Sequence, residues 1–236
     1  GRSRSRFLEF RMSRPLAPSV PGTDLLQWNA PDDEVAGAQP LATGGTAGES
    51  ARRSRFAWAL TGSGHFLDEC VALALRLPAC DLFLSAAAEE ILPMYAREID
   101  ALKTRCRVYR DKTASAVPVG MLYDDVYHTV VIAPATSNTV AKCVVGISDT
   151  LPTNMFAQAG KLGIPGIVFA CDTEPVVVTK SPHDWVTLRP RRVELDNVER
   201  LREIDFCEVV CSPEELEAAL QRRLDALSLA WTTSSS

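Results

Sequence analysis

The sequence predicts an α/β protein: a single domain built on a doubly wound parallel sheet. Short apolar runs alternate with helical patterns along residues 55–225, which is typical of a parallel sheet covered by helices on both faces. Residues 130–133 are apolar at every position, as in a strand that is buried on both faces. Three of the predicted strands end in small polar residues, and the carboxyl edge of such a sheet is where ligands bind.

Composition limits the class of protein. The chain has 236 residues, of which 46% are hydrophobic and 23% are charged, so it can bury a sizeable core. A net charge of −5 argues against a nucleic-acid partner, and no apolar run is long enough to span a membrane. The amino-terminal sequence also lacks the apolar core of a secretory signal, so we expect a cytoplasmic protein.

Seven cysteines are spread through apolar segments without the spacing of metal ligands. Free thiols in a reducing compartment therefore explain them better than disulfides do, and we expect no metal site. The spacing of Cys207 and Cys211, four residues apart, leaves a redox role for that pair open.

The first 53 residues differ from the rest. They are rich in Arg, Pro, Gly, Ser and Ala and have few periodic apolar positions, so we predict a flexible extension at 1–53. Residues 54–230 then form the domain. The arginines of the extension suit an anionic partner, and an extension without a binding role is the alternative.

The domain opens with a pattern typical of a phosphate cradle. Residues 56–60 form a buried strand, the sequence Thr-Gly-Ser-Gly at 61–64 a tight turn, and residues 65–77 a helix. Glycines let the backbone approach an anion, and the helix N-terminus faces it. The turn lacks the third glycine of a dinucleotide-binding fingerprint, because Leu67 holds that position.

A second strand, residues 81–84, ends at Ser85 and is followed by three alanines that leave room for a flat ligand. We expect a helix over residues 90–103, with Pro93 near its start, then a short strand at 105–109 and a loop at 111–122.

The central strand, residues 127–133, ends in Pro134 and Ala135 and is followed by Thr-Ser-Asn-Thr at 136–139. These four residues offer hydroxyls, an amide and free backbone N–H groups at the start of a helix, which suits a phosphate. An ordinary cap at a helix N-terminus is the alternative, since Ser, Thr and Asn are preferred there.

Further elements follow to the end of the domain. We expect a helix at 149–161, a strand at 164–170, a strand near Val193, a helix at 197–202, a strand at 208–210 and a capped helix from Ser212, while residues 176–178 either continue a strand or start a new edge.

These motifs resemble the homo-oligomeric flavin-containing cysteine decarboxylase superfamily over residues 55–225. The segment from Ala133 to Thr139, with Asp149 downstream, carries most of the similarity, and Thr-Gly-Ser-Gly at 61–64 and Ser-Ala-Ala at 85–87 add to it. The closest match is to the dihydromethanopterin reductase and archaeoflavoprotein branch, which the sequence at 191–201 also resembles.

The resemblance implies a Rossmann-like (flavodoxin-like) sheet that binds FMN without a covalent bond, near the contact between subunits of a trimer. Carried over to matching positions, the cofactor-binding residues would be Gly62, Ser63, Gly64, Ser85, Ala135, Thr136, Ser137, Asn138, Thr139, Ser148 and Asp149.

Departures from the superfamily pattern favour a reductase. The histidine that the decarboxylases carry before the motif aligns with Gly120, and their Pro-Ala-Met-Asn segment aligns with Ala-Cys-Asp-Thr at 170–173. The Arg-Glu pair of the flavin prenyltransferases keeps only its glutamate, at Glu174. A reductase needs none of these groups, because the flavin itself moves the electrons.

We therefore expect a ping-pong FMN reductase that converts a dihydropterin, dihydromethanopterin, to the tetrahydro form. NAD(P)H, another flavin or an iron–sulfur protein would be the donor, and the protein would be a homo-oligomer built from trimers. A decarboxylase or prenyltransferase of the same superfamily and an FMN electron carrier are the alternatives.

Two titratable residues are candidates for a catalytic role beside the flavin. His128 lies on the central strand, where a structural histidine is the alternative, and Asp149 precedes a helix, where an N-cap is the alternative.

Overall fold

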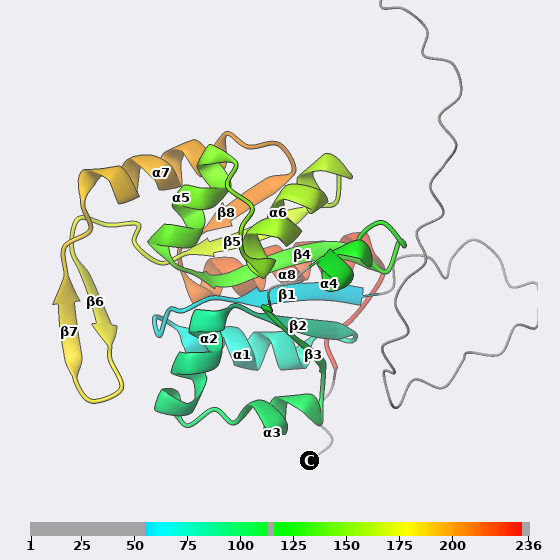
Figure 1. The fold of residues 1–236 in the computed structure, drawn as a ribbon, viewed down its shortest axis with the longest axis horizontal. Helices are drawn as coiled ribbons and strands as arrows, with labels where there is room; N and C mark the ends of the chain where they lie inside the picture. Colours follow the sequence, from blue (N-terminus) through cyan, green and yellow to red (C-terminus); the bar gives the residue numbers. More distant parts are fainter. Residues whose placement is uncertain (1–54, 113–115, 233–236) are drawn as a thin grey trace, which may run out of the picture. The chain divides into compact units, whose positions relative to one another are not determined.

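The computed structural model describes residues 55–112 and 116–232, so the extension predicted at 1–53 lies outside the described residues. Six parallel strands form one sheet in the order β3-β2-β1-β4-β5-β8 (Figure 1). These strands are β1 (Arg55–Leu60), β2 (Cys80–Leu84), β3 (Arg107–Arg110), β4 (Tyr127–Ala135), β5 (Gly166–Ala170) and β8 (Cys207–Val210). A separate antiparallel hairpin consists of β6 (Val177–Lys180) and β7 (Trp185–Leu188).

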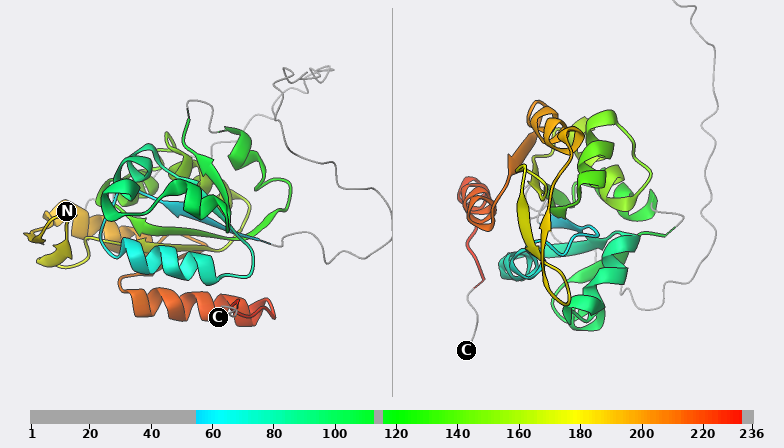
Figure 2. Two further views of the ribbon diagram at one scale, coloured as in Figure 1. Left: turned by 90° about the horizontal axis from the view of Figure 1, so that it is seen from below. Right: turned by 90° about the vertical axis from the view of Figure 1, so that its left-hand side faces the viewer.

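Helices cover both faces of the sheet. The helices are α1 (Leu67–Arg76), α2 (Ala86–Ile91), the 3-10 helix η2 (Leu92–Tyr95), α3 (Ile99–Lys103), α4 (Ala116–Gly120), α5 (Ser137–Val145), α6 (Leu151–Lys161), α7 (Arg192–Arg202) and α8 (Pro213–Ala226). Helices α1 and α8 share one core with the sheet, and α5, α6 and α7 share the core on the other face. Figure 2 shows α1 and α8 together on one side of the strands.

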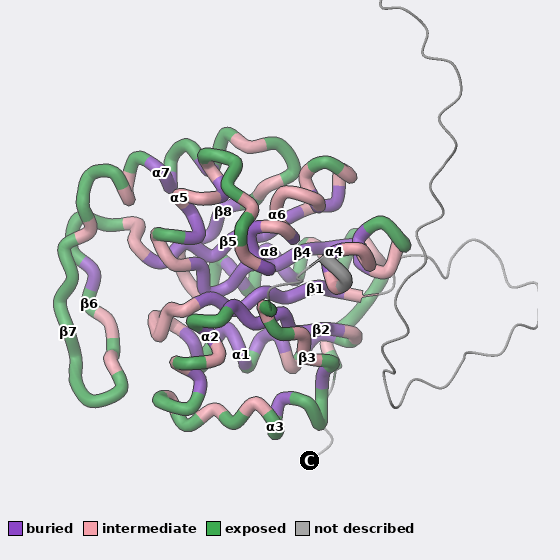
Figure 3. Tube along the Cα trace, viewed as in Figure 1, coloured by how far each residue is buried: buried purple, intermediate pink, exposed green. Residues whose placement is uncertain are grey.

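The alternation of side chains along β1 explains why the sheet has two cores. Phe56, Trp58 and Leu60 point to the face covered by α1 and α8, while Ala57 and Ala59 point to the face of α5 and α6. All five are fully buried, and Figure 3 shows the central strands buried along their length. The predicted pattern of strands buried on both faces is therefore confirmed.

The strand order places a switch point between β1 and β4. The chain moves outward from β1 through β2 to β3, then returns to the other side of β1 and continues through β4 and β5 to β8. This is the Rossmann order, in which a crevice opens where the connections diverge beyond the carboxyl ends of the central strands. The predicted fold class is confirmed, and the crevice lies at the ends of β1 and β4.

Four local predictions differ from the structure. The loop expected at 111–122 contains the short helix α4. The strand expected near Val193 is wrong, because residues 192–202 form α7, whose buried Val198 and Leu201 follow helical spacing. The helix expected over 90–103 is broken, because Ala96 takes a left-handed conformation with φ of 55°. Residues 176–178 start a new edge, and β7 was missed because all four of its residues are exposed and give no alternation.

Among the described residues, the helices are too short or too polar to cross a lipid bilayer.

Candidate functional site

Three loops that the sequence singled out meet at the switch point. The buried Thr61, which follows β1, donates its hydroxyl to the carbonyl of Pro134 at 2.7 Å and accepts the N–H of Thr136 at 3.0 Å. The N–H of Ser85, after β2, donates to the carbonyl of Leu60 at 3.0 Å. The ends of β1, β2 and β4 are therefore tied together, and Thr61, which the sequence reasoning did not select, is the bridge.

Close packing explains both glycines of the first loop. A Cβ atom added to Gly62 would lie 2.5 Å from the Cβ of Ala87, and one added to Gly64 would lie 1.8 Å from the Oη of Tyr95. Both distances are shorter than van der Waals contact allows, so these positions admit no larger side chain without a shift of a neighbour. The first loop thus lies directly against α2 and η2.

The third loop begins α5. The Thr136 hydroxyl accepts the N–H of Thr139 at 3.2 Å, which makes Thr136 the N-cap. Ala135 is buried, and its carbonyl accepts the N–H of Cys171 at 3.2 Å. Thr139 is also buried, whereas Ser137 is half-buried and Asn138 is exposed. The capping alternative is thus correct for Thr136 and leaves Ser137 and Asn138 free for another role.

Backbone N–H groups without a protein acceptor line the meeting point of these loops. Within residues 55–112 and 116–232, the N–H groups of Gly62, Gly64, Ser137 and Asn138 make no hydrogen bond to the protein. Unpaired N–H groups at a helix N-terminus carry a partial positive charge and attract anions. We call the group formed by residues 61–64, 85–87 and 135–139 the cradle; its chemistry suits a phosphate.

The end of β5 adds two residues that sequence reasoning did not place in the site. The Ser63 hydroxyl donates to the Cys171 sulfur at 3.2 Å, and burial raises the pKa of the Cys171 thiol to about 12, so this thiol is neutral at pH 7. The Ser137 hydroxyl donates to the carboxylate of Asp172, which is half-buried. Cys171 and Asp172 directly follow a predicted strand, which is the same sequence signal that selected other residues of the cradle.

Hydrogen bonds hold the β6–β7 hairpin beside the cradle. The Nδ1 atom of His65 lies 2.8 Å from the Thr179 hydroxyl, and the Tyr95 hydroxyl donates to the Lys180 carbonyl at 3.1 Å. Burial lowers the pKa of His65, against the opposing attraction of Asp172. Between the cradle and the hairpin lies a cavity of about 210 Å³, and a second cavity of about 350 Å³ shares Gly64, His65 and Tyr95 with it.

Three residues predicted for the site lie away from the cradle. Ser148 and Asp149 follow the carboxyl end of α5, whose nine residues span about 13 Å, and Asp149 pairs with Lys142 at 2.8 Å. His128 lies near the amino end of β4, about 23 Å along the strand from Ala135. Within one chain, these residues do not reach the cradle.

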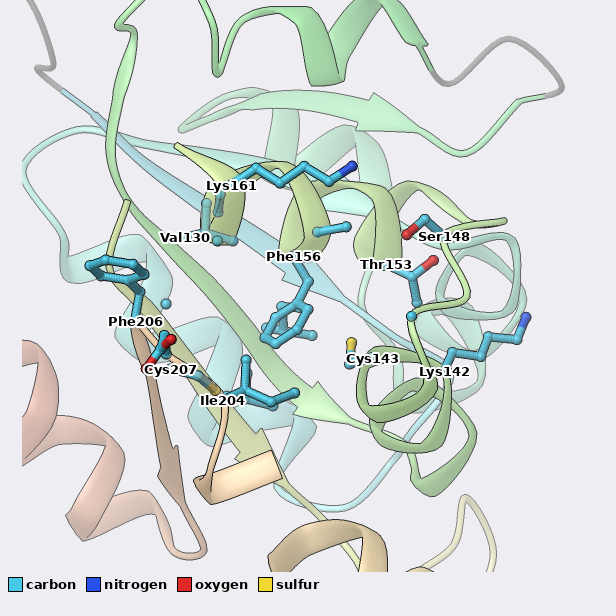
Figure 4. A pocket seen from close by; sticks show the side chains of 18 of the residues that line it. Val130, Lys142, Cys143, Ser148, Thr153, Phe156, Lys161, Ile204, Phe206 and Cys207 are labelled. Carbon is cyan, nitrogen blue, oxygen red and sulfur yellow. The ribbon is translucent and has the colours of Figure 1, made fainter. Parts of the chain in front are cut away.

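A further cavity lies in a different part of the molecule. It measures about 560 Å³ and lies between α5, α6 and the loop before β8, over the face of β4 and β5 (Figure 4). We call it the α5–α6 cavity. Its lining is mainly apolar, with Phe156 and Ile204 pointing inward, and of the predicted site residues only Ser148 belongs to it. Because it lies against the carboxyl ends of α5 and α6, where the helix dipole is negative, it is the weaker candidate for a phosphate.

Comparison with curated proteins finds two relatives with more than 30% identity. The chain is 34% identical over 180 residues to the uncharacterized protein MJ0730 of Methanocaldococcus jannaschii, covering 72% of this chain and 96% of that protein. It is 36% identical over 143 residues to the dihydromethanopterin reductase (acceptor) of Methanosarcina mazei, covering 55% of this chain and 60% of the reductase. The chain thus matches only about three-fifths of that reductase.

Comparison with solved structures also finds similar proteins. The crystal structure of Burkholderia xenovorans DmrB in complex with FMN, described as a cubic protein cage for redox transfer, is 68% identical with a TM-score of 0.70 and covers 75% of this chain and 98% of that chain. Phenylacrylic acid decarboxylase from Aquifex aeolicus shares the fold alone, with 17% identity, a TM-score of 0.53 and coverage of 76% and 99%.

A family model described as Flavoprotein matches residues 45–228, which is most of the chain. Its match includes every residue of the cradle and both strands at the switch point. The chain belongs to the Flavoprotein family, which confirms the superfamily that its motifs resemble.

Proposed function

We propose that the protein is an FMN-dependent reductase that holds FMN in the cradle. This proposal depends most on the set of unpaired N–H groups at the carboxyl ends of β1 and β4, where the chain connections diverge. The 68% identity to DmrB, which was solved with FMN, supports the choice of cofactor.

The residues of the cradle fit the cofactor. A phosphate would accept hydrogen bonds from the N–H groups of Gly62, Gly64, Ser137 and Asn138. Ser63 and the hydroxyls of Ser85 and Thr139 would complete the polar surroundings. The Ser85 hydroxyl accepts the N–H of Ala88 at 3.0 Å, and the Thr139 hydroxyl lies 3.0 Å from that of Thr136, so both hydroxyls are held in place.

Small side chains around the cradle leave room for the flat ring system. Ala86 and Ala87 are exposed at the start of α2, and Ala135 ends β4. Bound FMN would take reducing equivalents from a donor, NAD(P)H or a redox protein, and pass them to an acceptor in a ping-pong cycle. The chain itself supplies the position and orientation of the cofactor.

We propose a dihydropterin, dihydromethanopterin, as the acceptor. The names of the two curated relatives at 32% and 36% identity support this substrate class. A decarboxylase is disfavoured, because Gly120 stands where the superfamily's histidine is expected and closes the short helix α4 without a side chain that could act as a base.

We further propose a homo-oligomer built from trimers, in which a neighbouring copy completes the cofactor site. Ser148 and Asp149 do not reach the cradle of their own chain, so they would approach the cofactor from the next copy. The exposed apolar side chains of Val145 and Ile147, beside them, suit a contact between copies. The cage that DmrB forms supports an assembly of this kind.

Anaerobic stopped-flow spectroscopy of the FMN-loaded protein tests the function. We expect the flavin absorbance to bleach with a donor and to return on addition of dihydromethanopterin, with formation of the tetrahydro product. Return of the absorbance only with an oxidised redox protein would replace the reductase by an electron carrier. Release of CO₂ from a peptide or phenylacrylic acid substrate would instead establish the decarboxylase alternative.

A further inference from the structure

Asp172 is a carboxylate placed at the phosphate end of the cradle. Its neighbours there are Ser137, the first residue of α5, and His65. Burial lowers the pKa of His65, and the negative charge of Asp172 opposes this by raising it. Asp172 and residues 62–64 also line the same cavity, of about 210 Å³. A negative charge at this place is unexpected for a site that binds a dianion, because like charges repel across short distances.

The Ser137 hydroxyl can serve only one of two acceptors. A serine hydroxyl carries a single proton, and in this structure it is donated to Asp172. A phosphate that binds the N–H groups of Ser137 and Asn138 lies within reach of the same hydroxyl. The carboxylate and the phosphate therefore compete for one proton and for the same helix N-terminus.

We propose that Asp172 sets the affinity of the site for the phosphate of FMN by competing with it, and so makes the cofactor exchangeable. This inference rests on the proposed function, since it assigns Asp172 a role against the cofactor held in the cradle. It differs from a general charge effect, because it acts through Ser137 and only on ligands that carry a phosphate. Riboflavin, which has the same ring and ribityl chain but no phosphate, is therefore the matched ligand.

The test is a fluorescence titration of the full chain, freed of flavin, with FMN and with riboflavin. Asp172→Asn should lower the Kd for FMN by about tenfold, which corresponds to about 1.4 kcal/mol, because a charged competitor for the hydroxyl is lost. The Kd for riboflavin should change by less than about twofold. Inorganic phosphate should also compete with FMN at lower concentration in the variant.

Glu174→Gln is the matched control. It removes one negative charge from the same loop, two residues away, at an exposed position. If Asp172 acts through Ser137, Glu174→Gln should leave both Kd values unchanged. An equal gain in FMN affinity in the two variants would overturn the specific role of Asp172.

A double-mutant cycle adds a second check. In a Ser137→Ala background the contested hydroxyl is missing, so Asp172→Asn should tighten FMN by less than about threefold. Thermal melting without flavin shows whether each variant folds, and Asp172→Ser replaces Asp172→Asn if the latter does not.

The possible outcomes distinguish a failure of this inference from a failure of the proposed function. A wild-type chain that binds neither flavin would overturn the proposed function. A wild-type chain that binds FMN, together with an Asp172→Asn variant whose affinity is unchanged or weaker for both flavins, would overturn this inference alone.

Discussion

The two ends of the sheet differ in how their polar groups are hydrogen-bonded. At the amino end, the buried carboxylate of Asp81 accepts hydrogen bonds from Arg55, Arg107 and the hydroxyl of Tyr127, the last at 2.8 Å. At the carboxyl end, four backbone N–H groups of the cradle have no acceptor in the described part of the chain. The protein itself satisfies the buried carboxylate at the amino end, whereas the backbone N–H groups at the carboxyl end are left for a ligand.

This difference separates structural from functional polarity. Buried charges are retained when they are paired, and removal of one partner leaves the others without compensation. The network around Asp81 accordingly raises the pKa of Arg55 through its hydrogen bond to the carboxylate. Titratable groups alone would have pointed to the amino end, where His128 also lies, but the Asp81 carboxylate there already accepts its hydrogen bonds from the protein.

The largest effect we predict concerns stability at the amino end. Asp81→Asn should lower the free energy of unfolding by about 3–5 kcal/mol, because it leaves two arginines beside a buried, uncharged side chain. Urea denaturation of the flavin-free protein measures this. FMN affinity of the folded fraction should stay unchanged, and a parallel loss of affinity would contradict the separation of the two ends.

The second prediction concerns pH. Burial lowers the pKa of His128 to about 4, and its Nε2 atom has no hydrogen-bond partner within the described residues. Between pH 6.5 and 4 the unfolded chain binds a proton that the folded chain excludes, so stability should fall by about 3 kcal/mol as the pH falls across this range. Above pH 6.5 this contribution is constant. His128→Asn should flatten the part of the profile due to this residue, as measured by denaturation at pH 7 and pH 4.5.

The third prediction compares the cradle with the α5–α6 cavity. Gly62→Ala would bring a Cβ to 2.5 Å from Ala87 and push the first loop away from α2, so FMN affinity should fall by about tenfold or more. Gly160→Ala is the matched control, since Gly160 lines the α5–α6 cavity and its added Cβ meets nothing within 4 Å. A loss of affinity in Gly160→Ala alone would move the cofactor to that cavity.

The smallest effect should come from the ion pair between Lys142 and Asp149. Asp149→Ala should leave the free energy of unfolding nearly unchanged, because the carboxylate is exposed and solvent screens its attraction to Lys142. If a neighbouring copy brings Asp149 to the cofactor, FMN affinity should fall in the assembled protein but not in a dissociated subunit. Analytical ultracentrifugation combined with flavin titration distinguishes the two cases.

The sequence allowed the cradle to be predicted where each residue's role is local. Glycine turns, capping residues and strand ends leave short-range signals, so residues 62–64, 85 and 135–139 could be selected before the fold was known. The roles of Thr61 and Tyr95 could not be predicted, because each acts through a contact with a segment at least 73 residues away. Asp172 could have been selected from its place at the end of a strand, but its hydrogen bond to Ser137, 35 residues away, could not be predicted. His128 and Asp149 show the opposite case. Both are near the motif in sequence, but within one chain neither lies near the cradle.

Hydrogen–deuterium exchange with and without FMN tests most directly that the carboxyl end of the sheet holds the cofactor. We predict slower exchange on FMN binding at residues 61–66, 85–88 and 135–139, while the amino end around Asp81 and His128 stays unchanged. Slower exchange around the α5–α6 cavity, at 143–148, 153–160 and 203–207, with the cradle unaffected, would contradict the assignment.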